Sequence, residues 1–84
     1  MYYVLLIGPD IGDKDFEERD RLRDLVVESL KLEGILFAEY HWVWDETNKI
    51  QLLLGQYQNL TDAKEWIGFF VRKGFNLRIV EKIP

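Results

Sequence analysis

Three aromatic side chains at alternate positions, Tyr40, Trp42 and Trp44, are the residues best suited to contact a partner. Side chains two positions apart in a strand point to the same face of the sheet, so these rings share one face. Such rings can fill the core of a small protein, or they can stand outside it as part of a binding surface. The choice depends on which way their strand is turned.

Residue types that perform catalysis or bind metals are few. His41 is the only histidine and the chain has no cysteine, so no second nitrogen or sulfur ligand lies at a metal-binding spacing. We expect His41 to be wedged between its strand and the helices. The adjacent acids Asp45 and Glu46 belong to a turn, where carboxylates are solvated, and "GPDIGD" lacks the lysine of a phosphate-binding loop. The sequence therefore predicts a protein that is not an enzyme and that uses no metal or cofactor.

Length and composition predict a single domain, residues 1–84, with one modest core. The chain is 48% hydrophobic and 31% charged, and a domain of this size buries roughly 60–65% of its unfolded surface. Its 15 acidic and 11 basic residues give a net charge of −4, which repels a phosphate backbone, so nucleic acid is not an expected partner. No apolar stretch reaches the ~20 residues that span a bilayer, so membrane insertion is not expected either.

The pattern of apolar residues and turn signals predicts six elements in the order βαββαβ. The predicted strands cover residues 1–8, 35–44, 49–57 and 75–82, and the predicted helices cover 16–33 and 62–73. Asp15, with Glu18 three residues later, resembles a capping box, and Thr61 is the expected N-cap of the second helix. Gly34 and Gly74 are placed to end the helices in a left-handed conformation.

Each predicted helix has one apolar face. Those faces consist of Leu22, Leu25, Val26 and Leu30 in the first helix and of Ala63, Trp66, Ile67 and Phe70 in the second. Phe69 lies off the second stripe, so we expect it to be partly exposed.

The two halves of the chain resemble each other. "LLIG", a helix and "LEGILFAEY" correspond to "LLLG", a helix and "RKGFNLRIV". A pair of such units forms an α+β, ferredoxin-like sandwich, in which a four-stranded antiparallel sheet carries two helices on one face. We expect the first and third strands at its centre, and the other face of the sheet to be open.

Two arguments place the three rings on this open face. If the hairpin turn is "DETN" or its inner pair, Trp42 lies opposite Gln51 and Tyr40 lies opposite Leu53. If Gly34 corresponds to Gly74, residues 35, 37 and 39 face the helices, and the rings at the even positions face away. Both arguments turn the carboxylate of residue 39 toward the helices, where only an edge strand would let it reach water.

The open face then offers a candidate binding surface. Its proposed binding residues are Leu6, Tyr40, Trp42, Trp44, Gln51, Leu53 and Arg78, with Tyr2, Val4, Asn76 and Val80 around them. A patch of this composition exceeds the few hundred Å² that a soluble monomer normally exposes. We therefore expect a partner to cover it.

The stretches "LLLGQYQNLTDAKEWIGFFVRKGFNLRIV" and "YYVLLIG" followed by a helix and "LEGILFAEY" resemble the two halves of a SPOR domain. This resemblance implies a βαββαβ domain that binds peptidoglycan glycan strands lacking stem peptides, at the bacterial division septum, on the open sheet face. Rings stacked on sugars would suit that task. Leu6 and Pro9–Asp10 depart from the family pattern, which has a polar residue and Ser-Phe at these places. The chain as written suggests a cytoplasmic protein, and a septal, periplasmic one if it belongs to a longer exported chain.

The alternative is a protein-interaction domain. It would form a homodimer through the sheet face, or act as a small acidic regulator or inhibitor of a protein partner. Leu6 and Leu53 favour a protein over a sugar, because aliphatic side chains offer neither stacking planes nor hydrogen bonds. Both functions remain open from the sequence.

Overall fold

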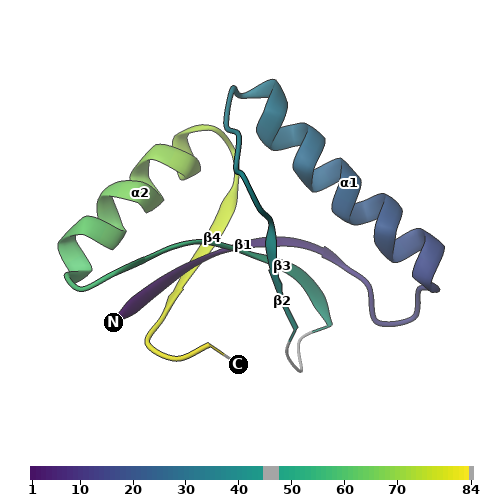
Figure 1. Cartoon of the computed structure of the whole chain (residues 1–84), viewed down its shortest axis with the longest axis horizontal. Helices are drawn as coiled ribbons and strands as arrows, with labels where there is room; N and C mark the ends of the chain where they lie inside the picture. The colour runs from purple at the N-terminus through teal and green to yellow at the C-terminus, as the bar shows by residue number, and fades with distance from the viewer. Residues whose placement is uncertain (45–47, 84) are drawn as a thin grey trace.

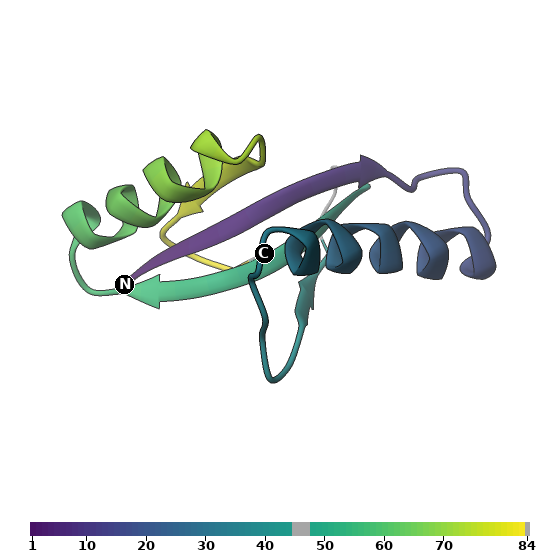
Figure 2. The same ribbon diagram turned by 90° about the horizontal axis from the view of Figure 1, so that it is seen from above.

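In the computed structural model, which describes residues 1–44 and 48–83, two helices cover one face of a four-stranded antiparallel sheet (Figures 1 and 2). The elements in chain order are β1 (Tyr2–Asp10), α1 (Phe16–Leu32), β2 (His41–Val43), β3 (Lys49–Tyr57), α2 (Leu60–Arg72) and β4 (Asn76–Val80). The strands are ordered β2-β3-β1-β4, which places β1 and β3 at the centre. The predicted ferredoxin-like α+β sandwich is confirmed.

The helix ends follow from local chemistry. The side chain of Asp15 accepts a hydrogen bond from the backbone N–H of Glu18 at 2.9 Å, which satisfies a free donor at the start of α1. The predicted N-cap at Thr61 is wrong, because α2 already begins at Leu60 after an extended Asn59, whose carbonyl accepts the N–H of Ala63. Neither helix in the described part of the chain is long and apolar enough to cross a membrane.

Both helices end in the same hydrogen-bonded motif. Gly34 and Gly74 adopt φ values of 76° and 92°, as predicted. The next residue then turns back, so that the Ile35 N–H donates to the Leu30 carbonyl at 2.9 Å and the Phe75 N–H donates to the Phe70 carbonyl at 3.2 Å. This motif brings the side chains of Ile35 and Phe75 against the core.

Two glycine substitutions in α2 and its cap should change stability in opposite directions. Gly74→Ala is expected to lower the free energy of unfolding by about 1 kcal/mol or more, because alanine is strained at this positive φ. Gly68→Ala is expected to raise it by about 1 kcal/mol, because Gly68 lies inside the helix and its Cβ would meet open space. Urea denaturation of both variants tests the pair, and a stabilising Gly74→Ala would contradict the left-handed cap.

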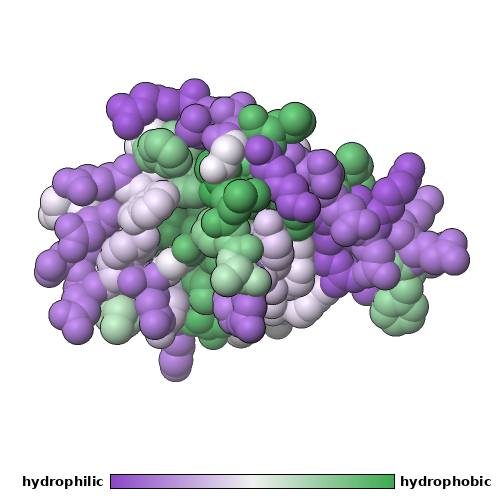
Figure 3. All heavy atoms as spheres, turned by 45° about the horizontal axis from the view of Figure 1, so that its top comes forward, coloured by the Kyte–Doolittle hydropathy of each residue, from purple (hydrophilic) through white to green (hydrophobic). Residues whose placement is uncertain are grey.

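The core lies between the sheet and both helices. Its buried residues are Leu6, Ile11, Val26, Leu30, Ile50, Leu52 and Phe70, and Leu22, Ile35, Phe37, Tyr40, Trp42, Leu54, Phe75 and Leu77 pack against it. Of the predicted helix faces, Leu22, Val26, Leu30 and Phe70 belong to this set, and Ala63 is buried as well. The prediction is wrong for Leu25 and Trp66, which are exposed. Figure 3 shows the helix-bearing side, where hydrophobic side chains form a band between the helices.

The strand boundaries depart from prediction at both ends of the first unit. β1 does not stop at Gly8 but continues to Asp10, with an irregular register between Ile7 and Asp10. A Cβ on Gly8 would lie 3.2 Å from side-chain atoms of Ile50 and Val26, so glycine permits this close packing. At the other end, residues 35–40 are irregular and β2 contains only three residues.

Candidate functional site

The predicted outward direction of the rings is wrong, because Tyr40 and Trp42 face the helices. Trp42 pairs with Leu52 on β3, not with Gln51 as the predicted hairpin required. Leu52 in turn pairs with Leu6, and Leu6 pairs with Leu77, so these side chains form one row across the sheet. Leu6 and Leu52 are core residues, so the row lies on the helix side.

One reason for the error is the length of the hairpin loop. Val43 pairs with Gln51, so an odd number of residues, 44–50, separates the paired positions. The predicted turn "DETN" and its inner pair both required an even number, and a change of one residue moves every side chain to the other face. Asn48 has a left-handed φ of 56°. The other three residues of the predicted turn lie outside the described part of the chain.

The second reason is a bend at Ala38 and Glu39. Ile35 and Phe37 pack against the core, as the internal repeat predicted. The bend then breaks the alternation, so that Tyr40 also packs against the core while the side chain of Glu39 is exposed. The carboxylate thereby avoids the cost of burial next to the helices.

The other predicted residues on the helix side are Trp44 and Leu6. The Trp44 ring is 47% exposed, and the guanidinium carbon of Arg23 on α1 lies 5.3 Å from its centroid. Leu6 is only 2% exposed and belongs to the core, as does Val4, so the predicted phase of β1 was also wrong. Neither Leu6 nor the three rings can contribute to a surface on the opposite side of the sheet.

The open face, as we use the term below, consists of two rows of side chains that cross all four strands on the side without helices. The first row is His41, Leu53, Leu5 and Arg78, and the second row is Val43, Gln51, Ile7 and Asn76. Gln51, Leu53, Asn76 and Arg78 were predicted here. Leu5, Ile7 and Val43 were not predicted here, although the hairpin register in which Trp42 pairs with Leu52 would have identified Val43.

A hydrogen bond between Arg78 and Gln51 lies at the centre of the open face. The Arg78 Nη2 donates to Gln51 Oε1 at 3.0 Å. Gln51 is only 1% exposed, and within the described residues its Nε2 has no hydrogen-bond partner. Leu5 is fully buried beside this pair. The centre of the face is therefore closed and partly polar, and the chain after Val80 turns back beneath the sheet (Figures 1 and 2).

His41 lies at the edge of the open face and is not wedged against the helices. Its side chain is exposed, and its Nε2 lies 3.6 Å from Glu39 Oε2. Within residues 1–44 and 48–83, no three His, Asp or Glu side chains come together in a way that could hold a metal ion.

The exposed apolar residues lie elsewhere than predicted. The described large hydrophobic residues with substantial exposure are Met1, Phe16, Leu25, Leu32, Leu36, Trp44, Leu60, Trp66, Phe69, Val71 and Ile83. None of them belongs to the two rows of the open face. On that face, Leu53 and Ile7 are half-buried, so its apolar patch is smaller than the sequence predicted.

A hollow of about 600 Å³ adjoins the open face where β2 begins. It is lined by Phe37, Ala38, Glu39, His41, Leu53, Leu54, Gly55 and Gln56. β2 pairs with β3 only from Gln51 to Leu53, so in the described chain residues 54–57 of β3 have no strand on this side. An unpaired edge beside an apolar hollow is a surface to which a further strand can be added.

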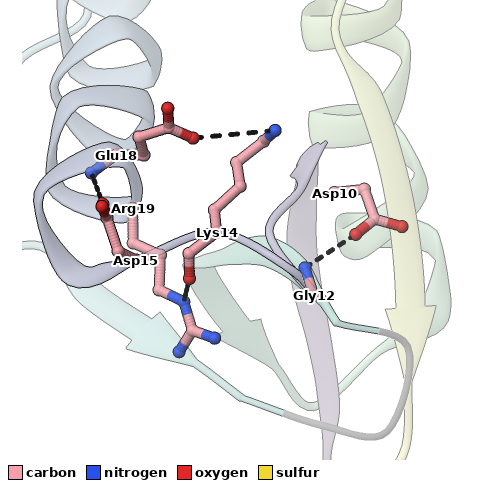
Figure 4. Close-up of polar contacts among 6 residues, drawn as sticks. All are labelled: Asp10, Gly12, Lys14, Asp15, Glu18 and Arg19. Atoms are coloured by element: carbon pink, nitrogen blue, oxygen red, sulfur yellow. Dashed lines mark hydrogen bonds and ion pairs between the residues drawn. The ribbon is translucent and has the colours of Figure 1, made fainter.

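The charged residues between β1 and the first turn of α1 form local hydrogen bonds and an ion pair. Asp10 accepts the N–H of Gly12 at 2.8 Å, and Arg19 Nε donates to the Lys14 carbonyl at 2.9 Å (Figure 4). Glu18 lies 3.9 Å from the Lys14 ammonium. These contacts order the connection between β1 and α1.

Comparison with known proteins gave no relatives. No protein-family model matches the chain, and searches of curated proteins and of solved structures found no match. The resemblance to SPOR domains therefore rests on the sequence patterns quoted above, and the functional argument rests on the geometry of this fold.

Proposed function

We propose that this domain is a non-catalytic protein-interaction module, and that an extended segment of the partner adds to the free edge of β3 beside the open face. The observation that carries this proposal is the unpaired stretch at residues 54–57 next to the hollow lined by Leu53 and Leu54. Main-chain hydrogen bonds to such an edge provide affinity, and the hollow receives alternate side chains of the added strand.

The side chains of the open face beside this edge suit a protein more than a sugar. Leu53, Ile7 and Val43 are aliphatic and offer no stacking planes, and Tyr40 and Trp42, which could have stacked on sugars, pack against the core. The partner segment is therefore expected to carry apolar residues at alternate positions. A second copy of the chain can supply such a segment through its own β3 edge.

Selection of displayed random peptides against the purified domain tests this function. We expect the selected peptides to alternate apolar and polar residues, and to protect the amides of residues 54–57 from hydrogen exchange. If the chain forms a homodimer, the same amides should be protected at high protein concentration. Peptides that protect only the helices would contradict the proposal.

A charge placed beside this edge should weaken the interaction. Leu53→Lys is expected to raise the dissociation constant of a selected peptide, or of the dimer, at least about tenfold, because the ammonium must be desolvated in the hollow. Val71→Lys is the matched control, since Val71 is an exposed aliphatic residue on α2. Sedimentation and peptide titration give both constants, and equal effects of the two variants would contradict the proposed position.

SPOR-like glycan binding is the second candidate, and Arg78 and His41 favour it. Arg78, held by Gln51, is half-buried and His41 is exposed, so both place hydrogen-bonding groups on the open face. The test is co-sedimentation with peptidoglycan sacculi stripped of stem peptides. Retention at low salt that is lost in Arg78→Ala would support the glycan, and no retention of the natural sequence would exclude it.

A further inference from the structure

A second pocket, of about 440 Å³, lies on the helix side of the sheet between the end of β3 and α2. It is lined by Tyr57, Asp62, Glu65, Trp66 and Phe69. The last four residues recur at helical spacing and therefore share one side of α2. Three aromatic rings and two carboxylates thus meet in one concave site, separate from the open face.

The two rings on α2 are held in place although they are exposed. Trp66 is 43% and Phe69 is 40% exposed, and their ring planes are nearly perpendicular, at 86°, with centroids 5.8 Å apart. The buried ring of Phe70 contacts both, with centroid distances of 5.6 Å to Trp66 and 5.4 Å to Phe69. The pocket therefore presents aromatic surface that is already ordered before any ligand binds.

Tyr57 reaches the pocket from the end of β3 because a glycine lies two residues before it. A Cβ on Gly55 would come within 2.8 Å of the Tyr57 hydroxyl and 3.2 Å of its ring atoms. Glycine thus lets the ring lie back along its own strand. The third ring of the site depends on this position.

The carboxylates give the pocket a negative charge that no ion pair with a described residue neutralises. Neither Asp62 nor Glu65 forms an ion pair with another described residue. Burial, and to a smaller extent the charge of Asp62, raises the pKa of the Tyr57 hydroxyl above its usual value. Asp62 therefore acts electrostatically on the ring that it faces across the pocket.

The Phe69 ring already attracts one cation in this fold. The Lys73 ammonium lies 5.2 Å from the ring centroid, where it is also held at 3.3 Å from Glu33 Oε2. Lys73 lies outside the set of residues that lines the pocket. The lining rings and acids therefore remain available to a cation from outside.

We propose that this pocket binds an alkylated ammonium group, such as the trimethylammonium of choline or of a trimethylated lysine side chain. Aromatic faces attract cations through their negative quadrupole, and the N-methyl groups gain dispersion contacts with the rings. An alkylated ammonium needs no hydrogen-bond acceptors and is weakly hydrated, so three rings and two nearby carboxylates satisfy it. A bare ammonium would lose more hydration than the rings return.

Nuclear magnetic resonance titration with choline tests the proposal against the neutral isostere in which carbon replaces the nitrogen. Both probes have the same shape, so only the charge differs. Choline is expected to shift the indole N–H signal of Trp66 and to bind about tenfold more tightly than the isostere. Equal affinities would mean a merely apolar pocket and would overturn the proposal, as would the absence of any shift.

Charge-matched variants locate the site. Glu65→Gln and Phe69→Leu are each expected to weaken choline binding several-fold, because one removes a carboxylate and the other removes a ring. Glu17→Gln, an exposed acid in the first turn of α1, changes the net charge equally and should leave choline affinity unchanged. An equal loss in Glu65→Gln and Glu17→Gln would indicate nonspecific attraction and would overturn the site.

Two further probes identify the source of the cation. A short capped peptide with one trimethyllysine is compared with free choline and with the same peptide carrying unmodified lysine. Tighter binding of the methylated peptide indicates a protein tail, and tighter binding of choline indicates a small molecule; both support the pocket. Preference for the unmodified lysine would overturn it.

Discussion

Replacing Phe70 by alanine is expected to lower the free energy of unfolding by about 3–5 kcal/mol. Phe70 is fully buried, and its ring contacts Trp66, Phe69 and Phe75. A domain of 84 residues has a total stability of roughly 4–13 kcal/mol, so this loss should remove a large fraction of it. Urea denaturation, followed by circular dichroism, measures the effect.

The neighbouring Phe69→Ala is the control for this experiment. It removes the same side chain from the same helix, but Phe69 is exposed at its outer side. Its loss should cost no more than about 1.5 kcal/mol, the sum of ring contacts and the cation of Lys73. If the two variants were equally unstable, the helix would be rotated relative to this structure.

Local sequence chemistry was enough to predict the elements and most of the core. Asp15 caps α1, and Gly34 and Gly74 end the two helices, because these residues act through the backbone beside them. The apolar residues Val26, Leu30 and Phe70 belong to stripes with helical spacing, and residues at this spacing share one face only in a helix. Their order along the chain then leaves few topologies.

The face of the sheet to which each β2 side chain points could not be predicted in the same way, because a shift of one residue along the strand reverses it. In "YHWVW" both phases are apolar, since Val43 is buried on one face while Trp42 packs on the other. The direction of the β2 side chains is set by the number of residues in the hairpin loop and by the bend at Ala38 and Glu39. Neither feature has a strong local signal in the sequence. The exposed carboxylate of Glu39 was the one warning, because the predicted register would have turned it toward the core.

As a result, only some of the predicted site residues lie on the open face, and the others lie on the helix side. Three predicted residues, Gln51, Leu53 and Arg78, lie on the open face. Their direction could be predicted because β4 alternates apolar and polar residues and β3 has a long partner strand in β1. Leu6 was misplaced because β1 is apolar on both faces, so the sequence pattern carries no phase. The unpaired edge at residues 54–57 was also beyond prediction, since it arises from the shortness of β2.

The ring direction itself leads to the second large effect. Trp42→Ala is expected to lower the free energy of unfolding by about 2–4 kcal/mol, because the indole packs against the core. It also stacks on the Tyr40 ring, with the two ring centroids 6.3 Å apart. Trp44→Ala removes an identical side chain two residues later, where the ring is 47% exposed and contacts the Arg23 cation. It should cost only about 1 kcal/mol.

Thermal and urea unfolding of the two tryptophan variants decide between the two registers. If the rings stood on the open face, neither substitution would destabilise the isolated domain by much, and both would instead weaken binding to a partner. With β2 in the register described here, Trp42→Ala loses stability because it opens a cavity at the edge of the core, and a peptide bound at the β3 edge should still bind the folded fraction of this variant. Equal, small losses of stability in both variants would restore the outward register and, with it, a flat aromatic surface suited to sugars.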